Sequence, residues 1–158
     1  MNTYNLEDII NSTDRYKLYN LICNDENLIE NTHFLQSNGV QTINIGKELA
    51  LFINELEDFS YLNIDVFDHA KKLLDKYKEK LKNTGNDVVA IYNLCILLEP
   101  SLELNAVQLL KEFSKTSALI IIWENKIEIP NYLNWPTQQK NFFLDFTETP
   151  LKTLQYAI

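Results

Sequence analysis

The residues that could take part in catalysis lie mainly where the expected strands end. The first expected strand, Tyr16 to Cys23, is followed by Asn24, Asp25, Glu26 and Asn27. A nucleotide site at this position needs a glycine-rich loop ending in lysine and serine or threonine, because backbone N–H groups and the lysine bind the phosphates. This loop contains no glycine and no lysine, and Asp25 and Glu26 place negative charge where a phosphate would lie. The sequence therefore disfavours phosphate binding.

A second requirement for nucleotide hydrolysis is a carboxylate at the end of the third strand, which holds the magnesium ion. The apolar run Val88 to Ile91 is followed instead by Tyr92, and Glu99 comes seven residues after Tyr92, in an expected loop. We therefore expect no catalytic residue, no cofactor and no metal ion. The phosphate loop at Cys23 to Asn27 is degenerate, and Tyr92 occupies the position of the lost carboxylate.

Cysteine and histidine give little support to other chemistry. Cys23 and Cys95 have neither a metal-binding spacing nor a disulfide framework, and each lies in an apolar run typical of small buried side chains. His33 and His69 have no ligand-like neighbours. An enzyme of another kind stays an alternative, because an expected helix N-terminus would activate the Cys23 thiol. Its candidate groups at the strand ends are Cys23, Asp25, Glu26, Tyr92, Asn93 and Glu124.

An expected alternation of strands and helices sets these positions. Right-handed connections between the strands give a three-layer α/β sandwich with a five-stranded, mostly parallel sheet. The length of 158 residues suits a single domain, 1–158, and ligands of such sheets bind beyond the carboxyl ends of the strands. The strands are expected at 16–23, 40–45, 87–94, 118–123 and 141–146, and the helices at 5–11, 24–36, 47–57, 65–82 and 105–115.

Three stretches depart from a simple alternation. The helices at 47–57 and 65–82 exceed what one strand connection needs, so we expect part of this pair to face a partner. The stretch 126–136 holds two of the four prolines and does not suit a long helix. The last residues, 151–158, are expected to form a short edge element.

The charge balance limits the possible partners. The formal net charge is -8, with 22 acidic against 14 basic residues, and Arg15 is the single arginine. Binding to a nucleic-acid backbone normally needs a basic patch, so we expect no direct nucleic-acid binding. The lysines at 71–82 are interleaved with Asp75 and Glu79, which is typical of a solvated helix face and leaves a contact surface as the alternative. The N-terminus is not typical of a signal peptide and no apolar run has membrane-spanning length, so we expect a cytoplasmic protein without membrane contact.

The stretch from Asp87 to Asn134 resembles a known family. An apolar strand is followed by Leu97 to Asn105 (LLEPSLELN), by Leu109 to Lys115 (LLKEFSK) and by a second apolar strand that ends in Trp123. This order, with Ile43 to Leu49 (INIGKEL), resembles the small P-loop protein of type 3 BREX phage-defence operons (the BrxF family). The resemblance implies a P-loop NTPase fold with strand order 5-1-4-3-2 and a role in a complex that restricts phage DNA.

The two departures from that family decide our hypothesis. The degenerate loop and Tyr92 predict a non-catalytic P-loop-like subunit of a defence complex, working through contacts with other proteins and possible self-association. The alternative is an acidic interaction or inhibitor protein that binds a basic, DNA-binding partner. Tyr132 and Trp135, in the loose stretch beside Pro136, are the partner-binding candidates because aromatic loop residues often anchor interfaces. Trp123, which ends a buried strand, is expected in the core.

Overall fold

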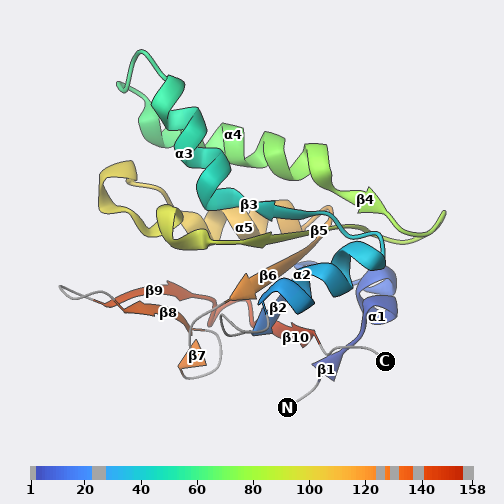
Figure 1. The fold of residues 1–158 in the computed structure, drawn as a ribbon. Coiled ribbons are helices and arrows are strands. Elements are labelled where there is room, and N and C mark those ends of the chain that lie inside the picture. The colour runs from blue at the N-terminus through green and yellow to red at the C-terminus, as the bar shows by residue number, and fades with distance from the viewer. Residues whose placement is uncertain (1–2, 23–27, 124–126, 129–131, 137–140, 155–158) are drawn as a thin grey trace.

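The computed structural model describes residues 3–22, 28–123, 127–128, 132–136 and 141–154 of the chain. Its centre is an open sheet with the strand order β1-β10-β2-β6-β5-β3, and β4 also pairs with β5 (Figure 1). All pairings along that order are parallel, and the β4 pairing is antiparallel. These strands are β1 (Thr3–Tyr4), β2 (Leu18–Ile22), β3 (Thr42–Asn44), β4 (Glu79–Lys80), β5 (Asp87–Tyr92), β6 (Ala118–Trp123) and β10 (Lys152–Leu154).

The order of the longer strands confirms the predicted fold class. Numbered along the chain, β2, β3, β5, β6 and β10 are the first to fifth strands, and they stand in the sheet as 5-1-4-3-2. This is the order that the sequence resemblance implies. With helices on both faces of a mostly parallel sheet, the chain forms a three-layer α/β sandwich.

The two central strands are apolar because both of their faces are covered. The six residues of β6 are all buried, and in β5 the four residues from Val88 to Ile91 are buried too. Successive side chains point to opposite faces of a sheet, so Val89 and Ile91 join one core cluster while Val88 and Ala90 join the other.

Helices form the two outer layers. α1 (Leu6–Asn11) and α2 (Leu28–Ser37) cover one face of the sheet and bury Leu6, Ile9 and Leu35 against it. α3 (Ile45–Glu55), α4 (Leu62–Tyr77) and α5 (Ala106–Ser114) supply the core cluster on the other face. Figure 1 shows α3 and α4 as a helical hairpin that extends beyond the sheet.

The C-terminal part differs from the prediction of a fifth central strand at 141–146. Residues Asn141–Asp145 form β9 in a second, antiparallel sheet with β7 (Ile127–Glu128) and β8 (Tyr132–Pro136). Leu144 and Phe146 are buried whereas Phe143 is 43% exposed, so one face of this stretch is covered and the other is open. A strand of this kind suits the surface of a domain, and the short β10 takes the fifth position in the main sheet.

The end of α4 also differs from the prediction. The helix ends at Tyr77 and does not continue to Lys82, because Lys78 is already extended and β4 pairs with the start of β5. Within the part of the chain that the structure describes, no helix has the length and apolarity needed to cross a membrane.

Candidate functional site

The carboxyl ends of β3 and β5 are joined by two asparagine side chains. Nδ2 of Asn93 donates to Oδ1 of Asn44 at 2.8 Å, and the same oxygen accepts the backbone N–H of Lys47 at 3.0 Å. Asn44 is thereby the N-cap of α3, and it lies beside Tyr92 in the parallel register. Asn93 is left-handed, with φ of 60° and ψ of 53°, a conformation that asparagine tolerates better than most residues.

Gly46 allows this junction to close. A Cβ at this position would lie 2.5 Å from the backbone oxygen of Asn93 and 2.6 Å from its Nδ2. Gly46 precedes the helix expected at 47–57, but it is the second residue of α3, and its small size permits this close approach. The β3–α3 and β5 ends therefore touch through backbone and amide atoms, with no space between them for another side chain.

Tyr92 lies where the sequence placed it, as the last residue of β5. Its half-buried side chain packs against the core cluster on the α1–α2 face. Asn93 and Leu94 follow it, so the described residues at the end of this strand include no carboxylate to hold a magnesium ion.

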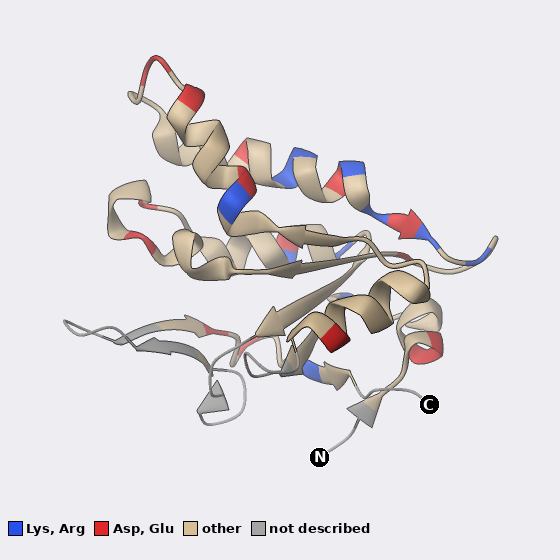
Figure 2. Cartoon of the chain, in the orientation of Figure 1, with Lys and Arg blue, Asp and Glu red and all other residues tan. Residues whose placement is uncertain are grey.

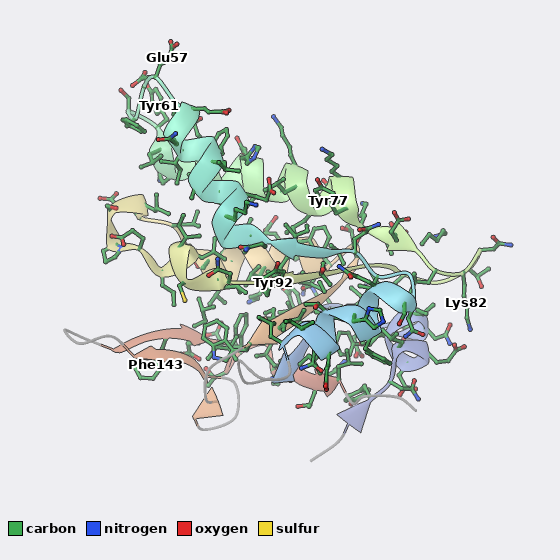
Figure 3. The ribbon with its side chains drawn as sticks, viewed as in Figure 1. Glu57, Tyr61, Tyr77, Lys82, Tyr92 and Phe143 are labelled. Carbon is green, nitrogen blue, oxygen red and sulfur yellow. The ribbon has the colours of Figure 1, made fainter. Side chains whose placement is uncertain are left out.

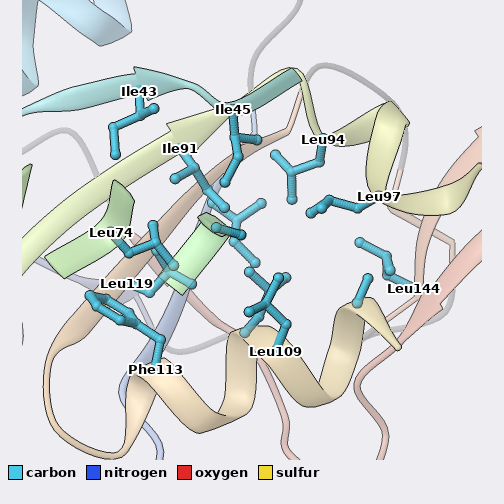
Figure 4. Packing of buried hydrophobic residues seen from close by; sticks show 14 of the residues in the cluster. Ile43, Ile45, Leu74, Ile91, Leu94, Leu97, Leu109, Phe113, Leu119 and Leu144 are labelled. Atoms are coloured by element: carbon cyan, nitrogen blue, oxygen red, sulfur yellow. The ribbon is translucent and has the colours of Figure 1, made fainter. Parts of the chain in front are cut away.

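The space beyond β5 is filled by apolar side chains. The 3-10 helix η1 (Leu94–Leu98) follows the strand, and its Leu94 and Leu97 are each 1% exposed. Figure 4 shows them beside Ile45 and Leu144, so η1 and the second sheet extend the hydrophobic core across this edge. Trp123, expected in the core, is 2% exposed and confirms that prediction.

Among the described residues, three buried side chains in β2, α2 and at the end of β6 have polar atoms without a hydrogen-bond partner. They are Asn20 through Oδ1, Asn31 through both amide atoms and Trp123 through Nε1. Such groups are uncommon because an unpaired buried polar atom costs free energy. The degenerate loop, Cys23 to Asn27, which connects β2 to α2, falls outside the described residues.

The tip of the α3–α4 hairpin has the opposite character. Four large apolar side chains between positions 51 and 64 are more than half exposed: Leu51 52%, Phe59 56%, Tyr61 65% and Ile64 53%. The stretch 51–68 also carries five carboxylates and neither lysine nor arginine. Figure 2 shows these acidic residues at the tip and the lysines farther along α4, and Figure 3 shows Glu57 and Tyr61 together at the tip.

Two grooves adjoin the short segment between η2 (Pro100–Leu102) and α5. One, of about 250 Å³, opens beside the first turns of α4. The other, of about 350 Å³, lies between this segment and β9 and includes the exposed Phe143. The first is lined by Asn63, Ile64, Phe67, Asp68, Glu103, Leu104 and Asn105, and the last three residues also line the second.

His69 belongs to the packing of the hairpin. Its ring stacks on Phe52 with centroids 4.0 Å apart and an interplanar angle of 5°. Burial lowers the pKa of His69, Lys72 lowers it further by charge repulsion, and Glu48 opposes the shift. Nowhere in the described residues do three or more His, Cys, Asp or Glu side chains gather as a metal site would need.

The structure places the partner-binding candidates only in part. The backbones of Tyr132 and Trp135 lie in β8, in register with Asp145 and Phe142, while their side chains fall outside what the structure describes. Sequence reasoning noticed the surplus pair of helices but did not single out the hairpin tip. The available signal was the cluster of large apolar residues in the acidic connection between the two helices.

The comparisons with known proteins add no relative. The chain matches no family model, no curated protein and no solved structure. The resemblance to the small P-loop protein of BREX operons therefore stays a prediction.

Proposed function

We propose that this chain is a non-catalytic P-loop-like subunit that acts through protein contacts in a bacterial anti-phage defence complex. The observation that carries the proposal is the carboxyl edge of the sheet. There the 5-1-4-3-2 order of β2, β3, β5, β6 and β10 is combined with a junction in which Asn44, Gly46 and Asn93 lie in direct contact.

The chemistry of this edge supports a scaffold role. A P-loop enzyme places a phosphate loop after the first strand and a carboxylate after the third, where metal and nucleotide meet. This sequence has Cys23 to Asn27 at the first position and Tyr92 at the second. Leucines of η1 fill the space beyond the third strand. These features favour a domain that has the layered P-loop-like architecture and does not catalyse nucleotide hydrolysis.

The assignment to a defence complex rests on the sequence resemblance from Asp87 to Asn134. It places the chain in the cytoplasm, where such a complex would meet phage DNA. We expect the chain to co-purify with the products of neighbouring defence genes and to remain bound to them without nucleotide.

Calorimetric titration with ATP and magnesium tests the loss of chemistry. The expected result is no binding heat and no change in melting temperature. Micromolar binding would contradict the pseudo-NTPase part. Tyr92→Asp is the matched variant: if the degenerate loop alone abolishes binding, this variant stays inactive too.

A second candidate is an acidic interaction or inhibitor protein with a basic partner. The observation that favours it is the hairpin tip, with its five carboxylates and exposed aromatic residues. Affinity purification from a host lysate separates the two candidates. Recovery of a DNA-binding enzyme without defence-operon proteins would favour the inhibitor, and recovery of those proteins would favour the subunit.

A further inference from the structure

The hairpin tip combines exposed apolar side chains with a groove. Ile64 is 53% exposed and lines the groove of about 250 Å³, whose other apolar walls are Phe67 and Leu104. Tyr61 precedes Ile64 by three residues, and residues three or four apart share one side of a helix start. Tyr61 and Ile64 therefore offer neighbouring exposed apolar side chains, of which Ile64 lines the groove.

Carboxylates surround this apolar surface. Asp68 and Glu103 stand on opposite walls of the groove, one on α4 and the other before α5. Glu55 ends α3, Glu57 and Asp58 lie in the connection that follows it, and all three are exposed. The stretch 51–68 itself holds no lysine or arginine beside these carboxylates.

Two lysines that follow the end of α4 are paired with carboxylates of the same chain. Lys78 pairs with Asp75 at 3.3 Å and with Asp87 at 3.9 Å, and Lys82 pairs with Glu7. Along α4 the first two charged residues, Asp65 and Asp68, lie nearest the apolar surface, and the lysines, with Asp75 among them, follow from Lys71 onward. Charge complementarity then specifies the sign of the partner.

We propose that the hairpin tip is a docking site for a basic amphipathic segment of a partner protein. One apolar side chain of that segment enters the groove between Ile64, Phe67 and Leu104, and its lysine or arginine side chains contact Asp68 and Glu103. This inference rests on the proposed function as a subunit that works through protein contacts, and it names the surface and the chemical class of the partner.

A second copy of the chain fits this site poorly. Its cationic residues outside α4 include Arg15, Lys111 and Lys115, which lie 5.3, 5.1 and 5.9 Å from the ring of Tyr16. These three cations gather round one half-buried aromatic ring. The lysines of 78–82 are engaged by carboxylates of the same chain.

A labelled synthetic peptide of leucine and lysine tests the site. The leucines are placed at i, i+3, i+4 and i+7, so that they form one face of a helix. Fluorescence anisotropy measures affinity, and amide chemical shifts of the protein locate the contact. We expect shifts concentrated at 59–68 and 103–105, and binding about tenfold weaker for a peptide of the same composition with the leucines scattered.

Matched variants separate the apolar contribution from the charge. Ile64→Ser is expected to weaken binding by about tenfold, because central apolar anchors dominate interface energetics. Ile29→Ser is the control, since Ile29 is 77% exposed on α2, which covers the opposite face of the sheet. Asp68→Lys is expected to weaken binding and its salt dependence, whereas Glu30→Lys on α2 changes the net charge equally and leaves binding nearly intact.

Defined results would overturn the proposal. Equal losses for Ile64→Ser and Ile29→Ser, or equal affinity for both leucine-lysine peptides, would show general attraction of a cation to an acidic protein. A dimer that dissociates on Ile64→Ser, seen by analytical ultracentrifugation, would make a second copy the occupant. Tyr61→Ser provides an independent apolar variant, and circular dichroism verifies that each variant is folded.

The test of the docking site and the test of the proposed function can fail independently of each other. ATP binding would contradict the non-catalytic assignment without affecting the peptide result. Failure of the peptide to contact the tip, while defence proteins still co-purify with the chain, would remove the docking site and leave the scaffold role standing.

Discussion

The carboxyl edge of the sheet and the tip of the α3–α4 hairpin differ in the exposure of their apolar side chains. At the edge, Leu94 and Leu97 are each 1% exposed and pack beyond the end of β5. At the tip, Tyr61 and Ile64 are 65% and 53% exposed beside a groove. In the described residues, the end of β5 is thus covered by core side chains, while the hairpin leaves apolar side chains exposed beside a groove.

Identical substitutions in the two regions give the largest contrast. Leu97→Ala should lower the free energy of unfolding by about 3 kcal/mol, because it leaves a cavity in the core. Leu51→Ala removes a side chain that is 52% exposed and should change the same quantity by less than about 0.5 kcal/mol. Urea unfolding measures both. Similar losses for the two variants would remove the distinction between edge and tip.

Substitution of Gly46, in the junction at the carboxyl edge, should have the next largest effect on the free energy of unfolding. Gly46→Ala should cost about 2 kcal/mol, because the added Cβ meets a backbone oxygen that cannot rotate away. Lys47→Ala, one residue later and exposed, serves as the control and should stay within about 0.5 kcal/mol of the parent. Thermal unfolding of the pair is the measurement. A stable Gly46→Ala protein would mean that the β3 and β5 ends are not locked together.

The asparagine contact at the edge has a smaller expected effect. Asn44→Ala removes the N-cap of α3 and leaves Nδ2 of Asn93 without this acceptor, which should cost about 1 kcal/mol. Asn54→Ala, at an exposed position toward the other end of α3, should be neutral or slightly stabilising since alanine is the better helix former. Chemical denaturation compares the two. Equal effects would argue that the cap does not anchor the helix.

The smallest expected effect is a pH dependence of stability that the hairpin should show and the edge junction should not. The edge junction holds asparagines, which do not titrate, whereas His69 packs within the hairpin with its pKa below the ordinary value of 6.5. A base with a lowered pKa stabilises the fold above its unfolded pKa, and that contribution is lost as the pH falls below about 6.5. The stability difference between the parent and His69→Gln should therefore shrink or reverse below pH 6.5. A difference that is flat from pH 8 to pH 5 would contradict this expectation.

The sequence correctly predicted the elements whose own residues show a clear apolar or capping pattern. The strand at 118–123 was expected with the bounds that β6 has, because ALIIIW is apolar on both faces. A helix was expected from residue 105, and Asn105 caps α5, its side chain accepting the N–H of Gln108 at 3.0 Å. Elements of this kind can be predicted from their local sequence alone.

The features that were missed depend on distant partners. β1 and β4 are each two residues long, so their sequences alone cannot specify pairing. The short element expected at 151–158 is present as β10 (Lys152–Leu154), but it lies between β1 and β2 and not at the edge of the sheet. The contact between Asn44 and Asn93 joins residues 49 positions apart. The hairpin tip could have been inferred from Phe59 and Tyr61, but the groove beside it needs the 103–105 segment, which only tertiary structure brings close.

α3 connects the two regions that have been contrasted. It begins at Ile45, in the locked edge, and its 11 residues end at Glu55, just before the tip. At 1.5 Å per residue the helix spans about 16 Å. The hairpin is thus a rigid spacer: whatever is held at its far end is kept at a fixed height above the sheet, in a fixed orientation. A bound protein would be positioned by the fold itself, without a flexible linker.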